Sequence, residues 1–493
     1  MSAARRPAHP TPVRAAARTP AKARDCRRKA CRSFGKILPL ESLNLLERRR
    51  WYRMKARERR GRTRKSRSRG TAPYSFGGQM GQPEIQPGSA WAAQRQDEEV
   101  HFAPEEIFYS RTDRRGLLRM GNSVFRRVAG YSWDELVGAP HKIVRHPDMP
   151  KAAFRIFWKR LLDGYAAGAY VKNRSKDGGY YWVFAVAQPI DGGFLSVRIK
   201  PTSPLFETVK TIYAAVRAEE TERRLDPDQS AGMLIQHLQK AGFTGYLDFM
   251  SQALCQELAA RDLAKTGHRA ARLDELLGVG QSLKAAAHEQ EHLLATLNAL
   301  QLLPNNIRIV AAQMEKSGGP ITAISENYRA ASKEILARLD AFAGSRGNLC
   351  TQMSRAVAEG AFLMGCAEVQ TELARQFGTE TASDCPENAD EEMALLEKLE
   401  GESTARAHGH MEEAVQVADR LAATGRELRR VVLGLDTIKV MGRVECARYG
   451  TSGARLAATI EDLDRYHVDI RSRLETLIAL SEKICDTAQA FTA

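Results

Sequence analysis

Only one short segment of the chain combines residue types at a spacing suited to metal-dependent catalysis. His288 and His292 are four positions apart, so on a helix they would share one face and could hold zinc, with Glu289 as general base. Zinc proteases of this pattern usually have an apolar residue after the glutamate and no acid before the second histidine. Here Gln290 and Glu291 occupy these positions. We therefore interpret the segment as a polar helix face and not as a metalloprotease site.

Other catalytic signatures are missing from the sequence. The eight cysteines are scattered without a Cys-x-x-Cys pair, which disfavours a zinc ribbon or a disulfide scaffold and favours reduced thiols in a cytoplasm. We find no Walker loop, kinase catalytic motif or nucleophile elbow, and neither a histidine-kinase ATP-binding domain nor a diguanylate-cyclase pattern. The sequence therefore predicts a protein that is not an enzyme.

The positive charge of the chain is concentrated at its N-terminal end. The formal net charge is +15, but residues 1–80 carry 24 of the 74 Lys and Arg residues and only four of the 59 acidic ones. Residues 1–98 lack a periodic apolar pattern, so we expect a disordered Arg-rich tail. It is either a tether for nucleic acid or anionic membrane, or a solvated tail, or a product of a wrongly assigned start with Met80 as the alternative. We favour the solvated or mis-assigned reading and do not expect nucleic-acid binding.

Residues 99–203 change to short β-type runs separated by turn signals. Two runs precede several short helices, and three further runs follow, joined by Gly178-Gly179 and Gly192-Gly193 turns. This order predicts an α+β domain with an antiparallel sheet. The expected strands are 107–112, 117–120, 170–174, 180–189 and 194–200.

Residues 204–493 have the Ala-, Leu-, Glu- and Arg-rich composition of long helices and contain no tryptophan. Apolar residues recur at coiled-coil spacing near the C-terminal end, so we predict a helical bundle whose core includes a second copy of the chain. Pro304 should break or kink a helix. No apolar run approaches the length of a membrane span, so we expect a soluble, cytoplasmic protein. The seam residues are Leu456, Ile460, Leu463, Ile470, Leu474 and Leu477.

Several motifs of the α+β region resemble, in order, the PAS domain of bacterial aerotaxis receptors. The most continuous one runs from His141 through Arg145-His146-Pro147-Asp148 to Phe154. The resemblance implies a five-stranded antiparallel sheet that cups a cofactor, which in this family is FAD. The other motifs lie at 122–125, 130–131, 135–138, 171–174 and 176–182.

The same resemblance implies which residues would contact a flavin. A flavin needs an apolar slot and a few polar groups; Asn amides can pair with its pyrimidine edge, and Arg with its pyrophosphate. The family's Pro-Trp pair is replaced here by Ala166-Ala167. FAD, another ligand or haem, and a cofactor-free PAS module therefore remain open, and His146 and Asp148 could simply cap the next helix. By position, the candidates are Asn122, Arg145, His146, Asp148, Asn173 and Trp182.

A second resemblance lies in the helical region. Residues 305–326 and 437–456 are similar in rhythm to the hairpin tip of chemoreceptor signalling domains, although the usual tip sequence is absent. This predicts two repeated helical hairpins, at about 280–345 and 410–485. It implies docking of a chemotaxis histidine kinase and its coupling protein; two generic helix–turn–helix hairpins are the alternative.

Together these observations predict a homodimeric sensory transducer. The PAS domain would sense redox state, oxygen or a small ligand, and the change would pass through residues 201–204 into a helix starting near Phe206. The output would serve chemotaxis or aerotaxis signalling. The alternative is a cofactor-free PAS scaffold that mediates dimerisation.

Overall fold

The computed structural model describes residues 98–492, apart from residues 269–270, 316–318, 344–347 and 378–388. The predicted disordered tail, including the alternative start at Met80, lies outside the described residues except for Glu98. Among the helices that are described, none combines the length and apolar character needed to cross a bilayer.

A five-stranded antiparallel sheet forms the first part of the described chain. Its spatial order is β2-β1-β5-β4-β3, so the N-terminal hairpin joins the C-terminal three strands through the β1–β5 pair. This confirms the predicted α+β domain, with strand ends within a few residues of those expected. The strands are β1 (Phe108–Asp113), β2 (Leu118–Gly121), β3 (Ala167–Arg174), β4 (Tyr180–Ile190) and β5 (Gly193–Ile199).

Short helices connect β2 to β3 and cover one face of the sheet. Asn122 caps the first of them by accepting a hydrogen bond from the Phe125 N–H, and Gly130 ends it with φ of 74°. The helices are α3 (Ser123–Ala129), α4 (Trp133–Leu136), the 3₁₀ turn η2 (His141–Val144) and α5 (Lys151–Leu162).

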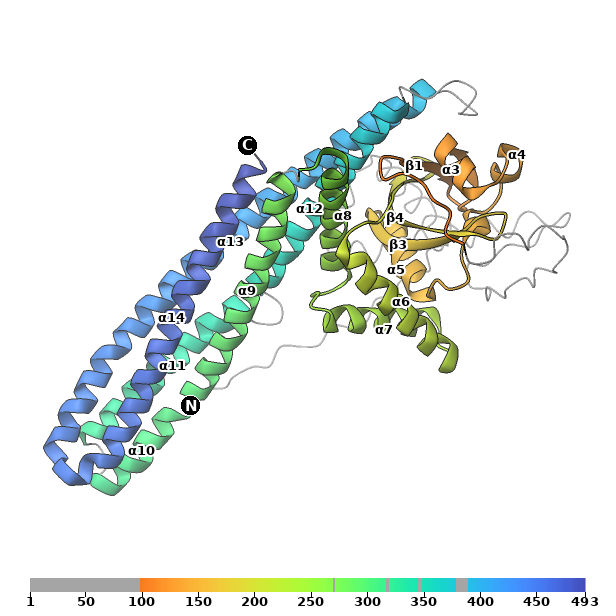
Figure 1. Cartoon of the computed structure of the whole chain (residues 1–493). Coiled ribbons are helices and arrows are strands. Elements are labelled where there is room, and N and C mark those ends of the chain that lie inside the picture. Colours follow the sequence, from red (N-terminus) through yellow and green to blue (C-terminus); the bar gives the residue numbers. More distant parts are fainter. Residues whose placement is uncertain (1–97, 269–270, 316–318, 344–347, 378–388, 493) are drawn as a thin grey trace, which may run out of the picture. The chain divides into compact units, whose positions relative to one another are not determined.

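The rest of the described chain is helical, which confirms the second half of the fold prediction. Helices α9, α10, α11, α13 and α14 pack around one core, and α12 links it to the sheet (Figure 1). Pro304 lies in the first turn of α10, so the predicted break is confirmed. The elements are α6 (Pro204–Glu222), α7 (Pro227–Lys240), α8 (Tyr246–Thr266), α9 (Ala271–Leu300), α10 (Leu303–Met314), α11 (Pro320–Ala343), α12 (Leu349–Phe377), α13 (Ala389–Tyr449), η3 (Gly450–Gly453) and α14 (Ala454–Ala490).

The predicted heptad seam is buried inside a single chain. Leu456, Leu463 and Leu474 are at most 1% exposed and pack against α9 and α13 of the same molecule. The periodicity therefore identified a core face correctly. Because this chain alone covers that face, the seam no longer supports the predicted dimer.

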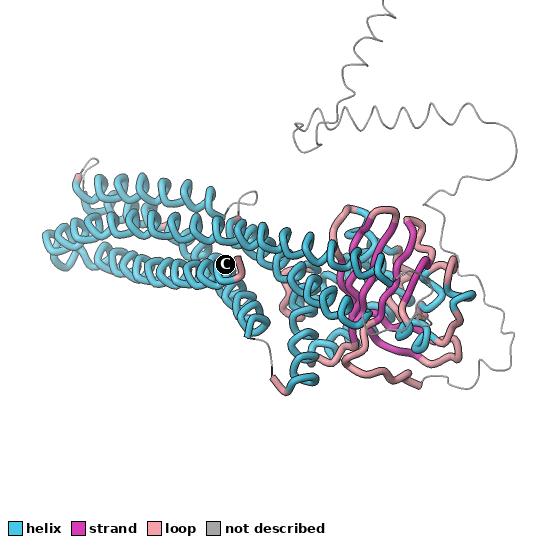
Figure 2. The backbone as a smooth tube through the Cα atoms, turned by 90° about the horizontal axis from the view of Figure 1, so that it is seen from above, coloured by secondary structure: helices cyan, strands magenta, loops and turns pink. Residues whose placement is uncertain are grey.

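The two faces of the sheet contact different parts of the chain. Residues alternate along each strand, so one set points toward α3, α4, η2 and α5, and the other toward the long helices. We call the first set, with the helices over it, the inner cup, and the second set the outer face. The strands lie beside long helices (Figure 2). Among these helices, α8 contacts β3 and α12 contacts β5.

Candidate functional site

The inner cup is closed by aromatic and aliphatic side chains. Phe108 of β1 and Tyr181 of β4 are fully buried, with ring centroids 5.6 Å apart and stacked. Phe125 of α3 lies over them and stacks on His141. The cup is therefore packed mainly by residues of its own domain.

Asn122 is fully buried at the junction of β1, β2 and α3. Its Oδ1 accepts hydrogen bonds from the backbone N–H groups of Tyr109 and Phe125, and its Nδ2 donates to the Ile107 carbonyl at 2.8 Å. The side chain thus fastens α3 to β1.

Arg145, His146 and Asp148 lie together beside β3, at the sheet edge away from Asn122. His146 is 8% exposed, and its Nδ1 accepts the Asp148 N–H. The Asp148 carboxylate bonds to Lys172 at 2.7 Å, and this bond lowers the pKa of Asp148 from its ordinary value. The Arg145 guanidinium sits 4.0 Å from the centroid of the Phe154 ring.

The other two predicted site residues are on opposite faces of the sheet. Asn173 is 3% exposed on β3, where its backbone bridges to Arg145, so it joins the cluster beside β3. Trp182 lies on the outer face of β4, with its ring edge-on to Phe206 of α6 at 5.3 Å. The structure thus brings Arg145, His146, Asp148 and Asn173 together, and leaves Asn122 and Trp182 apart from them.

The outer face is held to the helices by buried carboxyl groups. Glu257 of α8 is 0% exposed and accepts four hydrogen bonds. Two come from the Tyr170 hydroxyl at 2.7 Å and the Ser203 hydroxyl at 2.6 Å. The other two come from the N–H groups of Thr202 and Ser203, at 2.6 and 3.0 Å. One side chain therefore fixes β3 and the segment between β5 and α6 to α8.

Glu392 of α13 makes a similar contact with β1. Glu392 is 3% exposed, bonds to the Tyr109 hydroxyl and lies 2.9 Å from the Arg111 guanidinium. On β4, the Gln188 amide donates to Ser403 of α13 at 3.0 Å and accepts from Gln370 of α12 at 2.9 Å. Strands β1 and β4 are therefore tied to α12 and α13.

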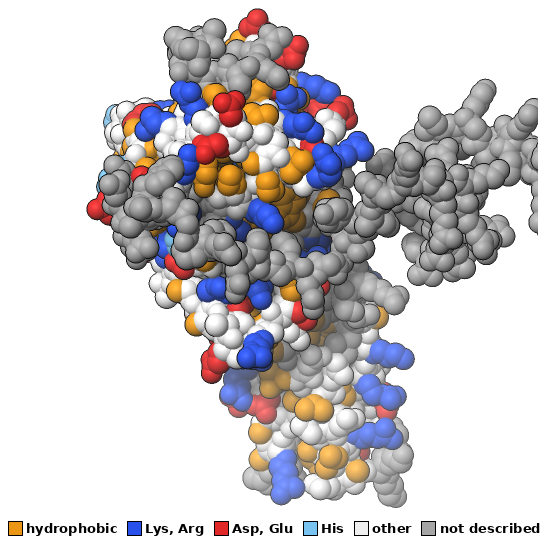
Figure 3. Space-filling model, turned by 90° about the vertical axis from the view of Figure 1, so that its right-hand side faces the viewer, with side chains coloured by type: hydrophobic (Ala, Val, Ile, Leu, Met, Phe, Trp, Pro, Cys, Tyr) orange, Lys and Arg blue, Asp and Glu red, His pale blue; other side chains and the backbone are white. Residues whose placement is uncertain are grey.

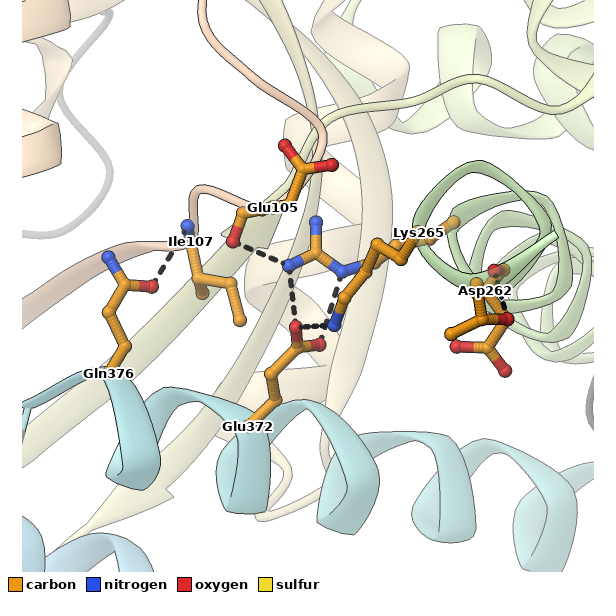
Figure 4. Close-up of polar contacts among 8 residues, drawn as sticks. Glu105, Ile107, Asp262, Lys265, Glu372 and Gln376 are labelled. Carbon is orange, nitrogen blue, oxygen red and sulfur yellow. Dashed lines mark hydrogen bonds and ion pairs between the residues drawn. The ribbon is translucent and has the colours of Figure 1, made fainter.

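A third contact group holds the segment before β1 (Figure 4). Arg261 of α8 is 1% exposed; it donates to both carboxylate oxygens of Glu372 and, at 2.8 Å, to the Glu105 carbonyl. Lys265 also bonds to Glu372, and Gln376 accepts the Ile107 N–H at 3.2 Å. The start of β1 is thus pinned between α8 and α12.

Sequence reasoning missed the charged residues of α8 that hold the sheet. Glu257 and Arg261 are charged, four positions apart, and flanked by Leu254, Leu258 and Ala259 on the buried face of α8. A charged pair at helical spacing inside an apolar stripe was the one available signal. It did not reveal the partner side chains, which are far away in sequence.

The His288–His292 segment lies on α9, as expected. The two imidazole rings contact each other, and Glu289 forms an ion pair with Arg473 at 3.0 Å. Among the described residues, no cluster of three or more possible metal ligands occurs. Glu289 is engaged in a contact that holds α9 to α14.

Two buried donor atoms on the inner face of the sheet lack a partner, which bears on whether a cofactor fits. They are Nη1 of Arg198 and the hydroxyl of Tyr181, and Nε1 of Trp133 on α4 is a third buried donor of this kind in the inner cup. The floor near them is made of small residues, including Ala167 where the aerotaxis family has Trp. Unpaired donors over a floor of small side chains fit a ligand rich in hydrogen-bond acceptors, such as a flavin.

This fold and cup define a PAS domain. Residues 120–197 match the family model described as PAS fold. The chain is also 40% identical over 129 residues to the aerotaxis receptor of Escherichia coli strain K12, a match that covers 25% of this chain and 26% of that receptor. The chain therefore matches about a quarter of the length of this relative.

Two solved structures are also similar to parts of the chain. One is the light-state LOV domain of the blue-light photoreceptor Aureochrome1, with 16% identity, 24% of this chain and 93% of that chain covered, and a TM-score of 0.19. The other is the blue-light activated histidine kinase of Erythrobacter litoralis, with 9% identity, 54% and 70% coverage, and a TM-score of 0.19.

Proposed function

We propose that this chain is a sensory transducer in which the inner cup of the PAS domain detects a signal and the outer face passes it to the helices. The supporting observation is the row of buried polar contacts between sheet and helices, centred on Glu257. A small movement of β3 or of the segment after β5 would strain these bonds together, because one carboxyl group joins both. The relay thus runs directly from sheet to helix, as well as through residues 201–204.

The proposed signal is the redox state of a bound FAD, or oxygen acting through it. The support is the similarity of the PAS region to an aerotaxis receptor and the unpaired donors in the cup. Arg145, His146, Asp148, Asn122 and Asn173 are the residues proposed to hold it. When bound, the flavin would supply a reversible change of charge and hydrogen bonding; this chain's part is to bind the ring and couple that change to the sheet.

The first experiment is a visible spectrum of the purified full chain, before and after reduction. A flavin absorption band that bleaches on reduction, and that is lost in Arg145→Ala, supports the proposal. A folded, colourless protein that does not take up added FAD rules out the flavin. The matched control is Arg174→Ala, an exposed arginine on the same sheet edge.

The second experiment tests the relay. Hydrogen exchange would be compared between the oxidised and reduced protein, with readout in α8, α12 and α13. We expect altered exchange in α8, and a weaker change in Glu257→Gln than in the exposed control Glu222→Gln. Identical exchange in both redox states, in a protein that does bind flavin, would contradict the relay.

The proposed cellular role is aerotaxis or chemotaxis signalling in the cytoplasm, with a homodimer acting on a chemotaxis histidine kinase and coupling protein. Loss of the gene should impair migration along an oxygen gradient. Unchanged migration would refute this role and leave the PAS sensing proposal standing.

A second candidate is a cofactor-free PAS scaffold. The observation that favours it is the packed cup, where Phe108, Tyr181 and Phe125 are each at most 1% exposed. A colourless protein that still binds partners through its helices would support this function over redox sensing.

A further inference from the structure

Arg198 of β5 is a buried cation on the inner face of the PAS sheet. It is 4% exposed, and its cross-strand neighbours are Phe108 on β1 and Ala185 on β4. Its Nη2 donates to the Ser110 hydroxyl at 2.9 Å and lies 2.5 Å from Nε2 of His141. The guanidinium therefore points into the cup and not to solvent.

This cation has no compensating negative charge among the described residues. The groups around it are the Ser110 hydroxyl, His141, the Phe125 ring at 5.6 Å and the Tyr181 hydroxyl. Burial lowers the pKa of Arg198 to about 10, and burial together with Arg198 lowers the pKa of His141 to about 3. His141 supplies no negative charge to balance the guanidinium, and a buried charge without a partner is costly.

Besides the charge of Arg198, the inner cup has hydrogen-bond donors without a partner and a floor of small side chains. Nη1 of Arg198 and the Tyr181 hydroxyl are buried donors without a hydrogen-bond partner. Beside them, cross-strand neighbours from β5 to the β3 edge have small side chains, and Leu161 of α5 packs over one end of this floor. These small residues are Ser196, Ala185, Ala187, Ala167 and Ala169.

We propose that the cup binds an oxyanion, the carboxylate or phosphate of a ligand, through the Arg198 guanidinium and the Tyr181 hydroxyl. Nη1 of Arg198 and the Tyr181 hydroxyl are the donors without a partner, and a charge-assisted hydrogen bond from Nη1 suits an anionic oxygen. The body of the ligand would lie against the floor of small side chains. This site differs from the Arg145 cluster, because Arg198 lies on the central strand β5 and the cluster lies beside the edge strand β3. The inference rests on the proposed function, because it names what the sensing cup recognises.

The test is thermal unfolding and calorimetric titration of the full chain with paired probes. Succinate is paired with succinamide, and FMN with riboflavin, so that each pair differs in its anionic oxygens. The two pairs distinguish a carboxylate ligand from a flavin phosphate, and inorganic phosphate tests the anion alone. The variants are Arg198→Met, Arg198→Lys and, as control, Arg174→Met, which changes an exposed arginine.

We expect at least one anionic probe to raise the Tm saturably while its neutral partner does not. Arg198→Met should weaken binding at least about tenfold, Arg198→Lys less, and Arg174→Met not at all. Without probe, Arg198→Met should unfold at or above the wild-type Tm, because it removes an unpaired buried charge. If Arg198 had only a structural role, Arg198→Met without probe would unfold at a lower Tm than the wild type.

The proposal is overturned if none of the anionic probes shifts the wild-type Tm, or if Arg198→Met responds as the wild type does. If Arg198→Met does not fold, the binding of the anionic probes to Arg198→Lys is compared with their binding to Arg174→Met. Equal binding to these two variants would overturn the proposal. An anion response in a colourless protein would support this site while ruling out a resident flavin. Flavin colour without any anion response would support a resident flavin and contradict this anion site.

Discussion

Replacing Glu257 by Gln should uncouple the PAS domain from the helices. The substitution keeps the size of the side chain, but one of its two acceptor oxygens becomes an NH₂ donor. Glu257 now accepts from two hydroxyl groups on Oε1 and two backbone N–H groups on Oε2. In the variant, the N–H groups of Thr202 and Ser203 would face another donor.

The size of the effect follows from those two lost bonds. Hydrogen bonds to charged groups contribute about 1.5–3 kcal/mol each, and the N–H groups left behind stay buried. Part of the loss is recovered when the amide turns its oxygen toward the N–H groups, because the two hydroxyl groups can then rotate and accept hydrogen bonds from the NH₂. We therefore expect the interface to lose about 3 kcal/mol, whereas the exposed Glu222→Gln control should change stability by less than about 0.5 kcal/mol.

The chain provides separate reporters for its two parts. Trp133, Trp158 and Trp182 lie in the PAS domain, and no tryptophan follows residue 203. In a background with Trp51 and Trp91 changed to Phe, tryptophan fluorescence reports on the PAS domain and far-UV circular dichroism mainly on the helices. The two transitions in guanidinium should coincide in the wild type and separate in Glu257→Gln.

Two results would refute this reasoning. If the fluorescence and circular-dichroism transitions already differ in the wild type, the outer face does not couple the two parts. If Glu257→Gln has the same midpoints as Glu222→Gln, the four hydrogen bonds do not stabilise the interface. A double-mutant cycle with Tyr170→Phe would then show a coupling energy near zero.

Three further predictions concern the two cores. Leu463→Ala should lower stability by about 2–5 kcal/mol in chemical denaturation, while Val468→Ala, at a position 56% exposed on the same helix, should have little effect. Gly193→Ala should disrupt the β1–β5 pair, because a Cβ would lie 1.8 Å from a backbone carbonyl oxygen. Gly434 has open space around it in α13, so Gly434→Ala should instead raise the Tm by increasing the free energy of unfolding by about 0.5–1 kcal/mol. Burial lowers the pKa of His467, which is fully buried beside Tyr328, so the unfolded chain binds its proton more readily. Stability should therefore fall as pH drops below about 6.5, and His467→Gln should flatten that dependence in pH-dependent thermal melts.

The strands of the PAS domain could be predicted because their signals are local. Gly178 and Gly192 adopt φ of 96° and 86°, which is the backbone requirement that the turn signals indicated. The capping role of Asn122 follows from the same kind of local rule. Position in the family motif, however, does not say which face of the sheet a side chain occupies, as Trp182 on the outer face demonstrates.

The partner of the C-terminal seam could not be predicted. Heptad spacing shows that Leu456, Leu463 and Leu474 face an apolar surface, but it does not show whose surface that is. Within one chain, α9 and α13 provide it, because the turn at Gly450–Gly453 folds α14 back along α13. Periodicity fixes the buried face of a helix and leaves its partner to long-range contacts.

The distribution of charge over the surface also could not be predicted from the sequence. The described surface seen in Figure 3 has basic and acidic side chains interspersed, in agreement with the near balance of 50 basic and 55 acidic residues beyond residue 80. A one-signed surface is the usual basis for binding a polyanion. On that face, the described residues therefore offer no such basis.

The polar character of the outer face has a physical consequence for signalling. Apolar side chains at Glu257, Glu392 and Arg261 would hold the sheet at least as firmly, because buried ionic groups give up hydration to form their bonds. Apolar contacts, however, tolerate sliding, whereas a hydrogen bond weakens steeply as its angle and length change. The present side chains therefore favour one position of the sheet on α8, α12 and α13 and penalise positions close to it. A displacement of the sheet by the cup would thus have to exchange several buried bonds at once, and this makes the interface respond as a unit and not gradually.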